Sequence, residues 1–371
     1  MEKAVKRMLS AALAALLCLP VAARGAGSWR TLAEGADTDS YFLISEYTGE
    51  VRITFLGDCT LGGPENRKNS ALGFARRVAE NGPDFPFREL RRLTGEDDLT
   101  VANLEGVLSD RALEKVPKEY NFIGPSAYTE ILASGGIDCV TLANNHSHDY
   151  GPAGYADTKA ALEGAGIAWF GTDAPAVWQN EEGLKIGFLG VSWSLTGNRY
   201  RQYAAQARML RDIGCAAVIT VMHAGTEYEY AAPDSYQRQI VRRAAACGSC
   251  LIIGHHPHVV QGVETVDGVP AVYSLGNCVF GGTTRAKDSD ALLAQAVLTF
   301  REGELTDLAL HFHPISITGD SRYNNYSPRF LTGDGAERVL EKMRKSTGTD
   351  PGAWDEREGA VWTGFTLPAA P

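Results

Sequence analysis

Short apolar runs rich in β-branched residues alternate along the chain with stretches of helical period, which is the pattern of an α/β layered domain. These runs predict strands at Val51–Leu56, Leu99–Ala102, Cys139–Ala143, Ile167–Phe170, Lys185–Val191, Ala216–Met222, Cys250–Ile253, Ala271–Leu275, Leu292–Phe300 and Leu305–Phe312. The helical period predicts helices at Lys68–Glu80, Ser126–Ala133, Gly154–Gly164, Tyr200–Ile213, Ser235–Ala246 and Ala336–Arg344. We therefore expect an α/β fold.

The last three predicted strands follow one another without a helix between them. The final two flank a four-residue turn that contains Gly303, which predicts a hairpin. Because a hairpin pairs antiparallel strands, we expect mixed sheets, two of them packed between helices. No Pro- or Gly-rich linker divides the interior, so one domain is predicted over residues 51–318, between a lead-in at 26–50 and a C-terminal extension with one helix at 319–371.

The first 25 residues have the composition of a secretory signal peptide. Three basic residues precede an apolar run of 16 residues at 8–23, which is shorter than the roughly 20 residues that a membrane-spanning helix needs. The bulky Leu17 directly before Cys18 argues against a lipoprotein site. We expect an exported protein, either cleaved after Gly25 and secreted or held at the cell envelope by an uncleaved anchor.

The chain is acidic, with 35 Lys and Arg residues against 45 Asp and Glu residues and a formal net charge of −10. Loss of residues 1–25, which hold four basic residues and one acidic residue, would change this charge to −13. A protein without a basic face cannot displace counterions from a phosphate backbone, so nucleic acid is excluded as a partner. Hydrophobic residues at 44% and charged residues at 22% exclude a disordered or fibrous chain.

Removal of the first 25 residues would leave six cysteines, which allow fifteen complete pairings that the sequence cannot distinguish. Those cysteines are Cys59, Cys139, Cys215, Cys247, Cys250 and Cys278. Cys139 and Cys215 lie beside apolar runs and are interpreted as buried small hydrophobes. Cys247 and Cys250 form an isolated CxxC pair without a second pair for zinc, so we expect a local disulfide or two free thiols there.

Several apolar strands run directly into residues that can bind a metal ion. Those residues are Asp58, Asn103, Glu105, Asn144, Asn145, His146, His148, Asp149, His223, His255, His256, His258 and Asn277. Ligands of open α/β sheets bind beyond the carboxyl ends of the strands, so six such strand ends are expected to meet at one site. Six of the eight histidines belong to this set, and we therefore predict a metal site.

The residue types narrow the choice of ion. Two carboxylates, an amide and at least three imidazoles form a mixed nitrogen and oxygen set without thiolate, which suits Mn, Fe, Zn, Co or Ni better than Ca or Mg. A single zinc ion would not need so many ligands. Two ions bridged by a carboxylate would use them all, and such a pair stabilises the attacking and leaving oxygens in phosphate ester hydrolysis.

The order of these motifs resembles that of the CapA family of capsule synthesis proteins, which is also named for poly-γ-glutamate biosynthesis. The motifs are Gly57-Asp58, Asn103-Leu104-Glu105, Asn144-Asn145-His146, Asp149-Tyr150-Gly151, His223, Gly254-His255-His256-Pro257-His258 and Ser274-Leu275-Gly276-Asn277. The resemblance extends from about Val51 to His313, most of the chain. It implies the four-layer α/β/β/α sandwich of calcineurin-like metallophosphoesterases, with an anionic envelope polymer and membrane-bound synthase components as partners.

The resemblance also implies roles for single residues. Those matching metal ligands are Asp58, Glu105, Asn145, His223, His256 and His258, with Glu105 as the carboxylate that bridges two ions. His146 matches the general acid of phosphoesterases, and Asp149 would orient it. Those expected to support the ligands or bind substrate are Asn103, Asn144, His255 and Asn277. The histidines interpreted as structural are His148, His311 and His313.

Two departures from the metallophosphoesterase pattern bear on catalysis. The usual Asp-x-His at the first strand end is Asp58-Cys59-Thr60 here, so its histidine is absent, and the second motif is Asn-x-Glu. CapA-like proteins share both departures. The first ion would then depend on Asp58, Glu105 and His258, and we expect it to bind more weakly than the second. Cys59 follows Asp58 in an extended strand, so its side chain should face the other way.

Two functions from different classes remain open at this point. One is a metal-dependent hydrolase that cleaves a phosphoester or amide in an anionic envelope polymer, a role in which a general acid would serve. The other is a non-catalytic component that binds the polymer or its export partners. An acidic protein repels a polyanion, so either function needs local positive charge. Arg285 and Lys287, in a Gly-rich loop, are the candidates, with a solvated loop as the alternative.

Overall fold

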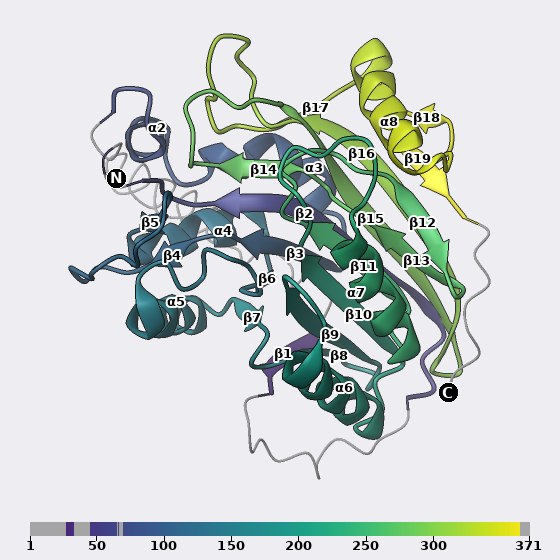
Figure 1. Ribbon diagram of the computed structural model, residues 1–371. Helices are drawn as coiled ribbons and strands as arrows, with labels where there is room; N and C mark the ends of the chain where they lie inside the picture. The colour runs from purple at the N-terminus through teal and green to yellow at the C-terminus, as the bar shows by residue number, and fades with distance from the viewer. Residues whose placement is uncertain (1–26, 33–44, 65, 67–69, 364–371) are drawn as a thin grey trace, which may run out of the picture.

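The computed structural model describes residues 27–32, 45–64, 66 and 70–363 of the 371-residue chain. Two β-sheets pack face to face, and helices lie on the outer face of each (Figure 1). The predicted α/β class with mixed sheets in four layers is therefore confirmed. The predicted signal segment at 1–25 lies outside the described residues.

The first sheet has seven strands in the order β1-β8-β9-β10-β11-β13-β12. Their bounds are Gly27–Thr31 (β1), Ala176–Asn180 (β8), Lys185–Ser192 (β9), Ala217–His223 (β10), Leu251–His255 (β11), Val263–Val266 (β12) and Val269–Val272 (β13). The central strands β9, β10, β11 and β13 are parallel, and the outer strands are antiparallel. Every residue of β10 is buried, as expected for a parallel strand covered on both faces.

The second sheet has ten strands, in the order β18-β19-β16-β15-β2-β3-β6-β7, with β14 paired to β2 and β17 paired to β16. Their bounds are Gly49–Thr60 (β2), Leu99–Leu104 (β3), Cys139–Thr141 (β6), Ala168–Phe170 (β7), Asn277–Phe280 (β14), Asp290–Arg301 (β15), Glu304–Ser316 (β16), Arg329–Phe330 (β17), Trp354–Asp355 (β18) and Gly359–Trp362 (β19). β15 and β16 form the expected antiparallel hairpin. A separate pair joins β4 (Val107–Leu108) to β5 (Ile123–Gly124).

The helices divide between the two sheets (Figure 1). Those that pack on the second sheet are α2 (Phe74–Asn81), the 3₁₀ helix η4 (Phe85–Leu90), α3 (Arg91–Thr94), the 3₁₀ helix η5 (Ser126–Tyr128), α4 (Thr129–Gly135) and α5 (Gly151–Gly164). α6 (Gly197–Asp212) and α7 (Ser235–Ala246) cover the first sheet, and α8 (Gly333–Thr347) packs beside β16. α7 begins after a capping box of Asp234 and Gln237, a signature readable from the sequence.

Three clusters of buried apolar side chains hold the four layers together. Phe55 of β2 and Phe188 of β9 belong to the cluster between the sheets. Leu104 and Leu132 belong to the cluster under the helices of the second sheet, and Ile240 of α7 belongs to that over the first. Because each central strand is buried on both faces, its end is held in a fixed place, which positions the side chains that follow it.

The chain changes sheets between β13 and β14. The strand predicted at Ala271–Leu275 ends already at Val272 in the first sheet. The chain then turns at Gly276, where φ is 73°, and Asn277 begins β14 in the second sheet, in register with Asp58. Asn277 therefore opens a strand instead of following one. This crossover brings Asn277 next to the end of β2, which the sequence pattern did not predict.

Candidate metal centre

Strands from both sheets end at one place, and polar side chains gather there. Asp58 lies near the end of β2, Glu105 follows β3, and β10 and β11 end at His223 and His255. β2 is parallel to β3 and β10 is parallel to β11, so these carboxyl ends lie at matching edges of the two sheets. The predicted convergence of strand ends is present in the fold.

Close backbone packing fixes the end of β2. A Cβ atom on Gly57 would lie 2.3 Å from the carbonyl oxygen of Gly276, and the amide of Asp58 donates a hydrogen bond to that oxygen at 3.0 Å. Only glycine allows this approach at position 57. The carboxylate of Asp58 is thereby positioned by two backbone strands.

Asp58, Glu105 and His258 form one group that could hold an ion. One ligand atom of each lies within 4.8 Å of the others. His258 Nδ1 lies 3.1 Å from Asp58 Oδ2, and His258 Nε2 lies 3.9 Å from Glu105 Oε1. All three side chains are buried.

Glu105, His223 and His256 form a second such group. His223 Nε2 lies 3.5 Å from Glu105 Oε1 and 3.1 Å from His256 Nδ1. Asn145 Oδ1 lies 2.7 Å from the same His223 nitrogen. The structure therefore brings together the six residues that the sequence singled out as ligands, and Glu105 belongs to both groups.

Glu105 provides the test of whether these residues fit a metal ion. Both of its carboxylate oxygens are buried, and neither has a hydrogen-bond partner among the described residues. Burial, together with the negative charge of Asp58, raises the pKa of Glu105 to about 8. A buried carboxylate without partners is costly unless a proton or a cation compensates it. Because the atoms facing it are histidine nitrogens, the donor set fits a divalent transition ion.

The protonation states of His256 and His223 also suit a metal. Burial lowers the pKa of His256 to about 4 and holds that of His223 well below its ordinary value. Both rings are therefore neutral at pH 7, which is the form of imidazole that binds metals. Burial favours the neutral form of Asp58, but the neighbouring imidazoles of His255 and His258 hold the pKa of Asp58 well below its ordinary value. His258 differs, because burial opposes its charged form but the negative charges of Glu105 and Asp58 raise its pKa to about 10. Its charged ring compensates the two carboxylates, and a metal ion would have to displace that proton.

Two asparagines hold the ligands in place. Asn103 Nδ2 donates to Asp58 Oδ1 at 2.7 Å and lies 3.1 Å from His223 Nδ1. Asn144 Nδ2 in turn donates to Asn103 Oδ1 at 3.0 Å and to the carbonyl oxygen of Leu104 at 2.8 Å. This network joins ligands from both sheets, the role expected of residues that surround a metal site.

His146 faces the same centre from the β6–α5 loop. Its Nδ1 atom lies 2.7 Å from Asp149 Oδ2, and its Nε2 atom lies 3.9 Å from Glu105 Oε1. Asp149 Oδ2 also accepts a hydrogen bond from the amide of Phe122 at 2.6 Å, and the Phe122 ring packs on His146 with 4.3 Å between ring centroids. Lys118 Nζ forms an ion pair with Asp149. Asp149 and Phe122 therefore orient His146 so that Nε2 points to the centre.

Of the other residues predicted to support the ligands or bind substrate, some lie at the centre and one does not. His255 Nδ1 lies 3.3 Å from Asp58 Oδ1, and Asn277 Oδ1 lies 2.9 Å from His258 Nδ1, so both touch proposed ligands. Lys287 Nζ lies 4.0 Å from the ring centre of Tyr228, a residue beside His258. Arg285 instead lines a separate cavity with residues of the β16–α8 region, so it does not face the centre.

The cysteines lie outside the centre. The six described cysteines are free thiols, including Cys247 and Cys250. Cys59 is buried in the apolar cluster on the outer side of the second sheet, together with Cys278. The alternation of an extended strand therefore turns Cys59 away from the ligands while Asp58 faces them.

Sequence reasoning did not identify several residues at the centre. Glu227 forms a third possible group with His256 and His258, and Lys118 contacts Asp149 and His146. Trp193 is 52% exposed, and its ring centroid lies 5.4 Å from that of His256. Glu227 and Lys118 come from irregular segments, and no apolar run leads into them. Trp193 directly follows β9, so a rule that included aromatic residues at strand ends would have found it.

Backbone conformation is unusual around the histidines. The non-glycine residues with positive φ near the centre are Trp193 at 68°, Tyr228 at 59°, His256 at 98° and His258 at 58°. Bulky residues rarely adopt this conformation, which costs about 1–3 kcal/mol each and is found mostly at functional sites. The concentration of such residues supports a functional role for this edge of the sheets.

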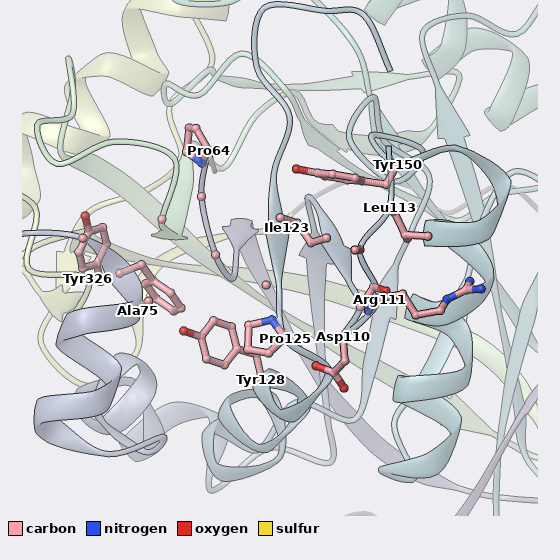
Figure 2. Close-up of a pocket in the computed structure, with 18 of the residues that line it drawn as sticks. Pro64, Ala75, Asp110, Arg111, Leu113, Ile123, Pro125, Tyr128, Tyr150 and Tyr326 are labelled. Atoms are coloured by element: carbon pink, nitrogen blue, oxygen red, sulfur yellow. The ribbon is translucent and has the colours of Figure 1, made fainter. Parts of the chain in front are cut away.

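A cavity of about 640 Å³ lies near the centre (Figure 2). Ile123, Tyr128 and Tyr150 line it, and Ile123 directly follows the residue that packs on the ring of His146. The cavity contains Arg111, but that side chain pairs with Asp157 at 2.6 Å. Its lining is otherwise largely apolar and aromatic, so it offers little attraction for a polyanion.

Comparison with known families gives one match that covers more than half of the chain. The family described as bacterial capsule synthesis protein PGA_cap matches residues 52–282. All of the proposed ligands and the pair His146 and Asp149 lie within these residues. The matched region also contains six of the seven strands of the first sheet and, in the second sheet, β3, β6, β7, β14 and nearly all of β2.

Curated relatives share this region at low identity. The PGA biosynthesis protein CapA of Bacillus subtilis is 27% identical over 322 residues, which cover 78% of this chain and 80% of that protein. The capsule biosynthesis protein CapA of Bacillus anthracis is 27% identical over 238 residues, 57% of this chain and 58% of that protein. A probable polyglutamine synthesis accessory protein of Mycobacterium tuberculosis is 26% identical over 205 residues, 46% of this chain and 53% of that protein. The chain thus spans little more than half the length of the last two.

Among solved structures, the calcineurin-like phosphoesterase YfkN from Bacillus subtilis matches with a TM-score of 0.42 and 15% sequence identity. The match covers 76% of this chain and 95% of that one.

Across the described part of the present chain, none of the helices has both the length and the apolar character needed to cross a membrane.

Proposed function

The chain belongs to the bacterial capsule synthesis protein family PGA_cap, and from this premise we propose that it is an exported, metal-dependent hydrolase of capsule or poly-γ-glutamate biosynthesis. The family predicted from the motif order is confirmed. The proposed reaction is hydrolysis of a phosphoester or amide bond in an anionic envelope polymer or its precursor. Membrane-bound synthase components are proposed as further partners.

The observation that carries this proposal is the buried carboxylate of Glu105. Its two oxygens lack hydrogen-bond partners within the described residues, and they face histidines at 3.5 and 3.9 Å. A structural ion pair would have saturated these oxygens with hydrogen bonds. A carboxylate shared by two groups of ligands is what a pair of ions requires.

We assign one ion to Asp58, Glu105 and His258, and a second ion to Glu105, Asn145, His223 and His256. The ligand chemistry favours Mn, Fe or Zn. When bound, such ions supply an acidified water and polarise the substrate oxygen. The chain's own ligands keep these positions in a buried, low-dielectric site, where charge interactions are stronger than in water.

His146 is assigned the role of general acid. Asp149 holds its Nδ1 atom, so the Nε2 atom faces the centre, and the charged ring, with a proton on Nε2, can deliver that proton to the leaving group. Burial lowers the pKa of His146, and Asp149 partly offsets this by favouring the charged ring. Lys118 forms an ion pair with Asp149, and this pair offsets the desolvation cost of burying a carboxylate beside the imidazole.

The alternative is a non-catalytic component that binds the polymer or its synthase partners. It is favoured by Thr60, which occupies the position where metallophosphoesterases carry a further histidine ligand. The Thr60 hydroxyl is buried and has no hydrogen-bond partner within the described chain. A position with only three protein ligands would bind its ion more weakly, and a single remaining ion would support shape without efficient hydrolysis.

The proposal is tested by a screen of the purified full chain against phosphomonoesters, phosphodiesters and γ-glutamyl peptides, with Mn, Zn and Fe supplied separately. We expect metal-dependent turnover of one substrate class and a loss of about 100-fold or more in His146→Ala, because general acids contribute about 10²–10⁴-fold. His311 of β16 is half-buried and bonds to the carbonyl oxygen of Glu358, and His311→Ala is the matched control, which should retain turnover. Bound metal without turnover of any class would favour the assembly function instead.

A further inference from the structure

Glu227 lies on the solvent side of the metal centre, in the loop between β10 and α7. One of its carboxylate oxygens lies within 4.8 Å of a ring nitrogen of His256 and of His258. Both histidines are buried, whereas Glu227 is exposed. Glu105, which is fully buried, lies on the inner side of the same histidines. The centre therefore has one carboxylate on its buried side and another on its solvent side.

The two histidines beside Glu227 belong to different ion positions. His258 belongs to the first position and His256 to the second, and Glu105 is shared by both from the inner side. Glu227 has the same relation to the two positions from the solvent side, because it lies near one histidine of each. A carboxylate has two oxygens with several lone pairs, so a single carboxylate can contact two ions. Glu227 is thus placed where a second shared ligand would lie.

The backbone of the loop fixes Glu227 beside the histidines. The amide of the next residue, Tyr228, donates a hydrogen bond at 2.8 Å to the carbonyl oxygen of Pro257, which lies between the two histidines in the sequence. Tyr228 has a left-handed conformation with φ 59°, which is rare for an aromatic residue. Gln261 Nε2 donates to the carbonyl oxygen of Glu229 at 2.9 Å. These contacts tie the loop to the segment that carries the histidines.

Protein contacts do not explain the position of the Glu227 carboxylate. It forms no hydrogen bond and no ion pair with any residue that the structure describes, so its oxygens lie beyond hydrogen-bond distance of both imidazole rings. Two ligands of one ion each lie about 2.0–2.2 Å from it, and hence up to about 4.4 Å from each other. A separation that is too long for a hydrogen bond and below 4.8 Å is close to the separation of two ligands around an ion.

We propose that Glu227 is a further ligand of the centre, shared by the two ions from the solvent side, and that an incoming oxyanion must displace it. The inference rests on the proposed metal centre. Glu227 is exposed while the other proposed ligands are buried or half-buried, so it lies on the side from which a substrate enters. Its carboxylate therefore has two opposed effects, since it strengthens metal binding and competes with an anion for the same ions.

The first test measures metal binding by the chelator-treated full chain, by titration calorimetry with Mn or Zn. We expect Glu227→Gln to weaken both loading events about tenfold, because loss of a residue that supports a metal site costs about 10–100-fold in affinity. Glu229→Gln is the matched control. It removes the same charge from the same loop, and Gln can still accept the hydrogen bond from the amide of Ala231, so metal affinity should stay unchanged.

Glu227→Asp separates ligation from charge. It keeps the negative charge but shortens the side chain, so it should also weaken metal binding, by less than Glu227→Gln does. An effect of charge alone would leave Glu227→Asp equal to the wild type, and that result would overturn the assignment of Glu227 as a ligand.

The second test measures binding of inorganic phosphate to the full chain at saturating Mn. Glu227→Gln should bind phosphate about tenfold more tightly than the wild type, because a competing charged contact is absent. Glu229→Gln should bind it as the wild type does. A residue that only supports the loop would not weaken metal binding and strengthen phosphate binding together. Phosphate affinity that is unchanged in Glu227→Gln would overturn the proposed displacement.

The outcomes distinguish this inference from the metal centre on which it rests. A wild type that binds two ions, with metal affinity unchanged in Glu227→Gln, would overturn the inference and leave the centre intact. Equal weakening of metal binding by Glu227→Gln and Glu229→Gln would also overturn the inference, because only the charge of the loop would then matter. A wild type that binds no metal would overturn the centre itself and the inference with it.

Discussion

At the scale of single residues, the two proposed ion positions share Glu105 but differ in their other ligands. His258 serves the position that contains Asp58, and His223 serves the position that contains Asn145. In the first position, Thr60 stands where a further histidine ligand would be. This position therefore has fewer protein ligands, so water must fill more of its coordination sites. The first ion should therefore bind more weakly and exchange faster than the second.

Stepwise loading is the resulting prediction. His258→Ala should abolish the weaker binding event and preserve the tighter one, while His223→Ala or His256→Ala should abolish the tighter one. Cys59→Ser should change little, since Cys59 faces the apolar cluster. Titration calorimetry of chelator-treated protein with Mn or Zn resolves the two events. Equal affinities for two ions, or loss of metal in Cys59→Ser, would show that the first position is misassigned.

His313 predicts a pH dependence that is independent of metal. Burial lowers its pKa to about 4, and the positive charges of His311 and Arg92 add to the shift. The unfolded chain binds a proton near pH 6.5, so between about pH 6.5 and 4 unfolding takes up a proton and the free energy of unfolding falls as pH falls. The full contribution is at most about 3 kcal/mol.

The measurement compares denaturant unfolding of the wild type and His313→Gln at pH 7.5 and pH 4.5. Gln cannot titrate, so the variant should gain about 2 kcal/mol relative to the wild type over this range. A difference between the two proteins that is independent of pH would mean that His313 is accessible to protons in the folded state.

At the scale of elements, the buried central strands and the amphipathic helices were predictable from the sequence. β3, β9, β10 and β15 lie where apolar runs placed them, and α7 matches its predicted bounds. Strands β1, β8 and β14 were missed because they are short or polar at one end, and tertiary pairing stabilises them. The crossover of β13 into β14 could not be predicted, because the pattern of apolar residues does not reveal which sheet a strand joins.

Gly57→Ala tests how backbone packing positions Asp58. The new Cβ would lie 2.3 Å from a backbone oxygen of Gly276, so β2 and β14 must separate. We expect the free energy of unfolding to fall by about 1–3 kcal/mol and metal affinity to fall with it. Denaturant unfolding and calorimetry measure both quantities. Gly164→Ala, in α5 with no atom within 4 Å of its Cβ, is the control and should be neutral or slightly stabilising.

An unchanged stability of Gly57→Ala would contradict this account of the β2 end. Normal stability with weakened metal binding would instead mean that the strands adjust at the expense of Asp58 alone. The Gly164→Ala control reports the general effect of adding a methyl group, so either result can be distinguished from that effect.

At the scale of the whole molecule, the candidate centre exists only where the two sheets meet. Residues from β2, β3, β10 and β11 are up to about 200 positions apart in sequence, and the sequence predicted their convergence because strand ends of α/β sheets share an edge. Glu227 and Lys118 could not be predicted, because loop conformation sets their approach to the histidines. The signal segment, the domain bounds and the catalytic roles of His146 and Asp149 stay predictions.

The whole-molecule charge also shapes the proposed function. With a net charge of −10, the protein repels polyanions at long range, so attraction must come from the ions and from nearby basic side chains such as Lys287. This attraction is short-ranged at physiological salt, where the Debye length is about 8 Å. Binding of an anionic oligomer should accordingly depend strongly on metal loading.

The central claim is that Glu105 joins two ions in one centre, and the most direct measurement is the number of ions bound per chain. Elemental analysis of the dialysed full chain, reconstituted with Mn, Fe or Zn, should give two ions for the wild type and for the control His311→Ala. Glu105→Gln keeps the shape of the side chain but removes the shared charge, so it should retain fewer than one ion. Two ions retained by Glu105→Gln, or none bound by the wild type, would contradict the account.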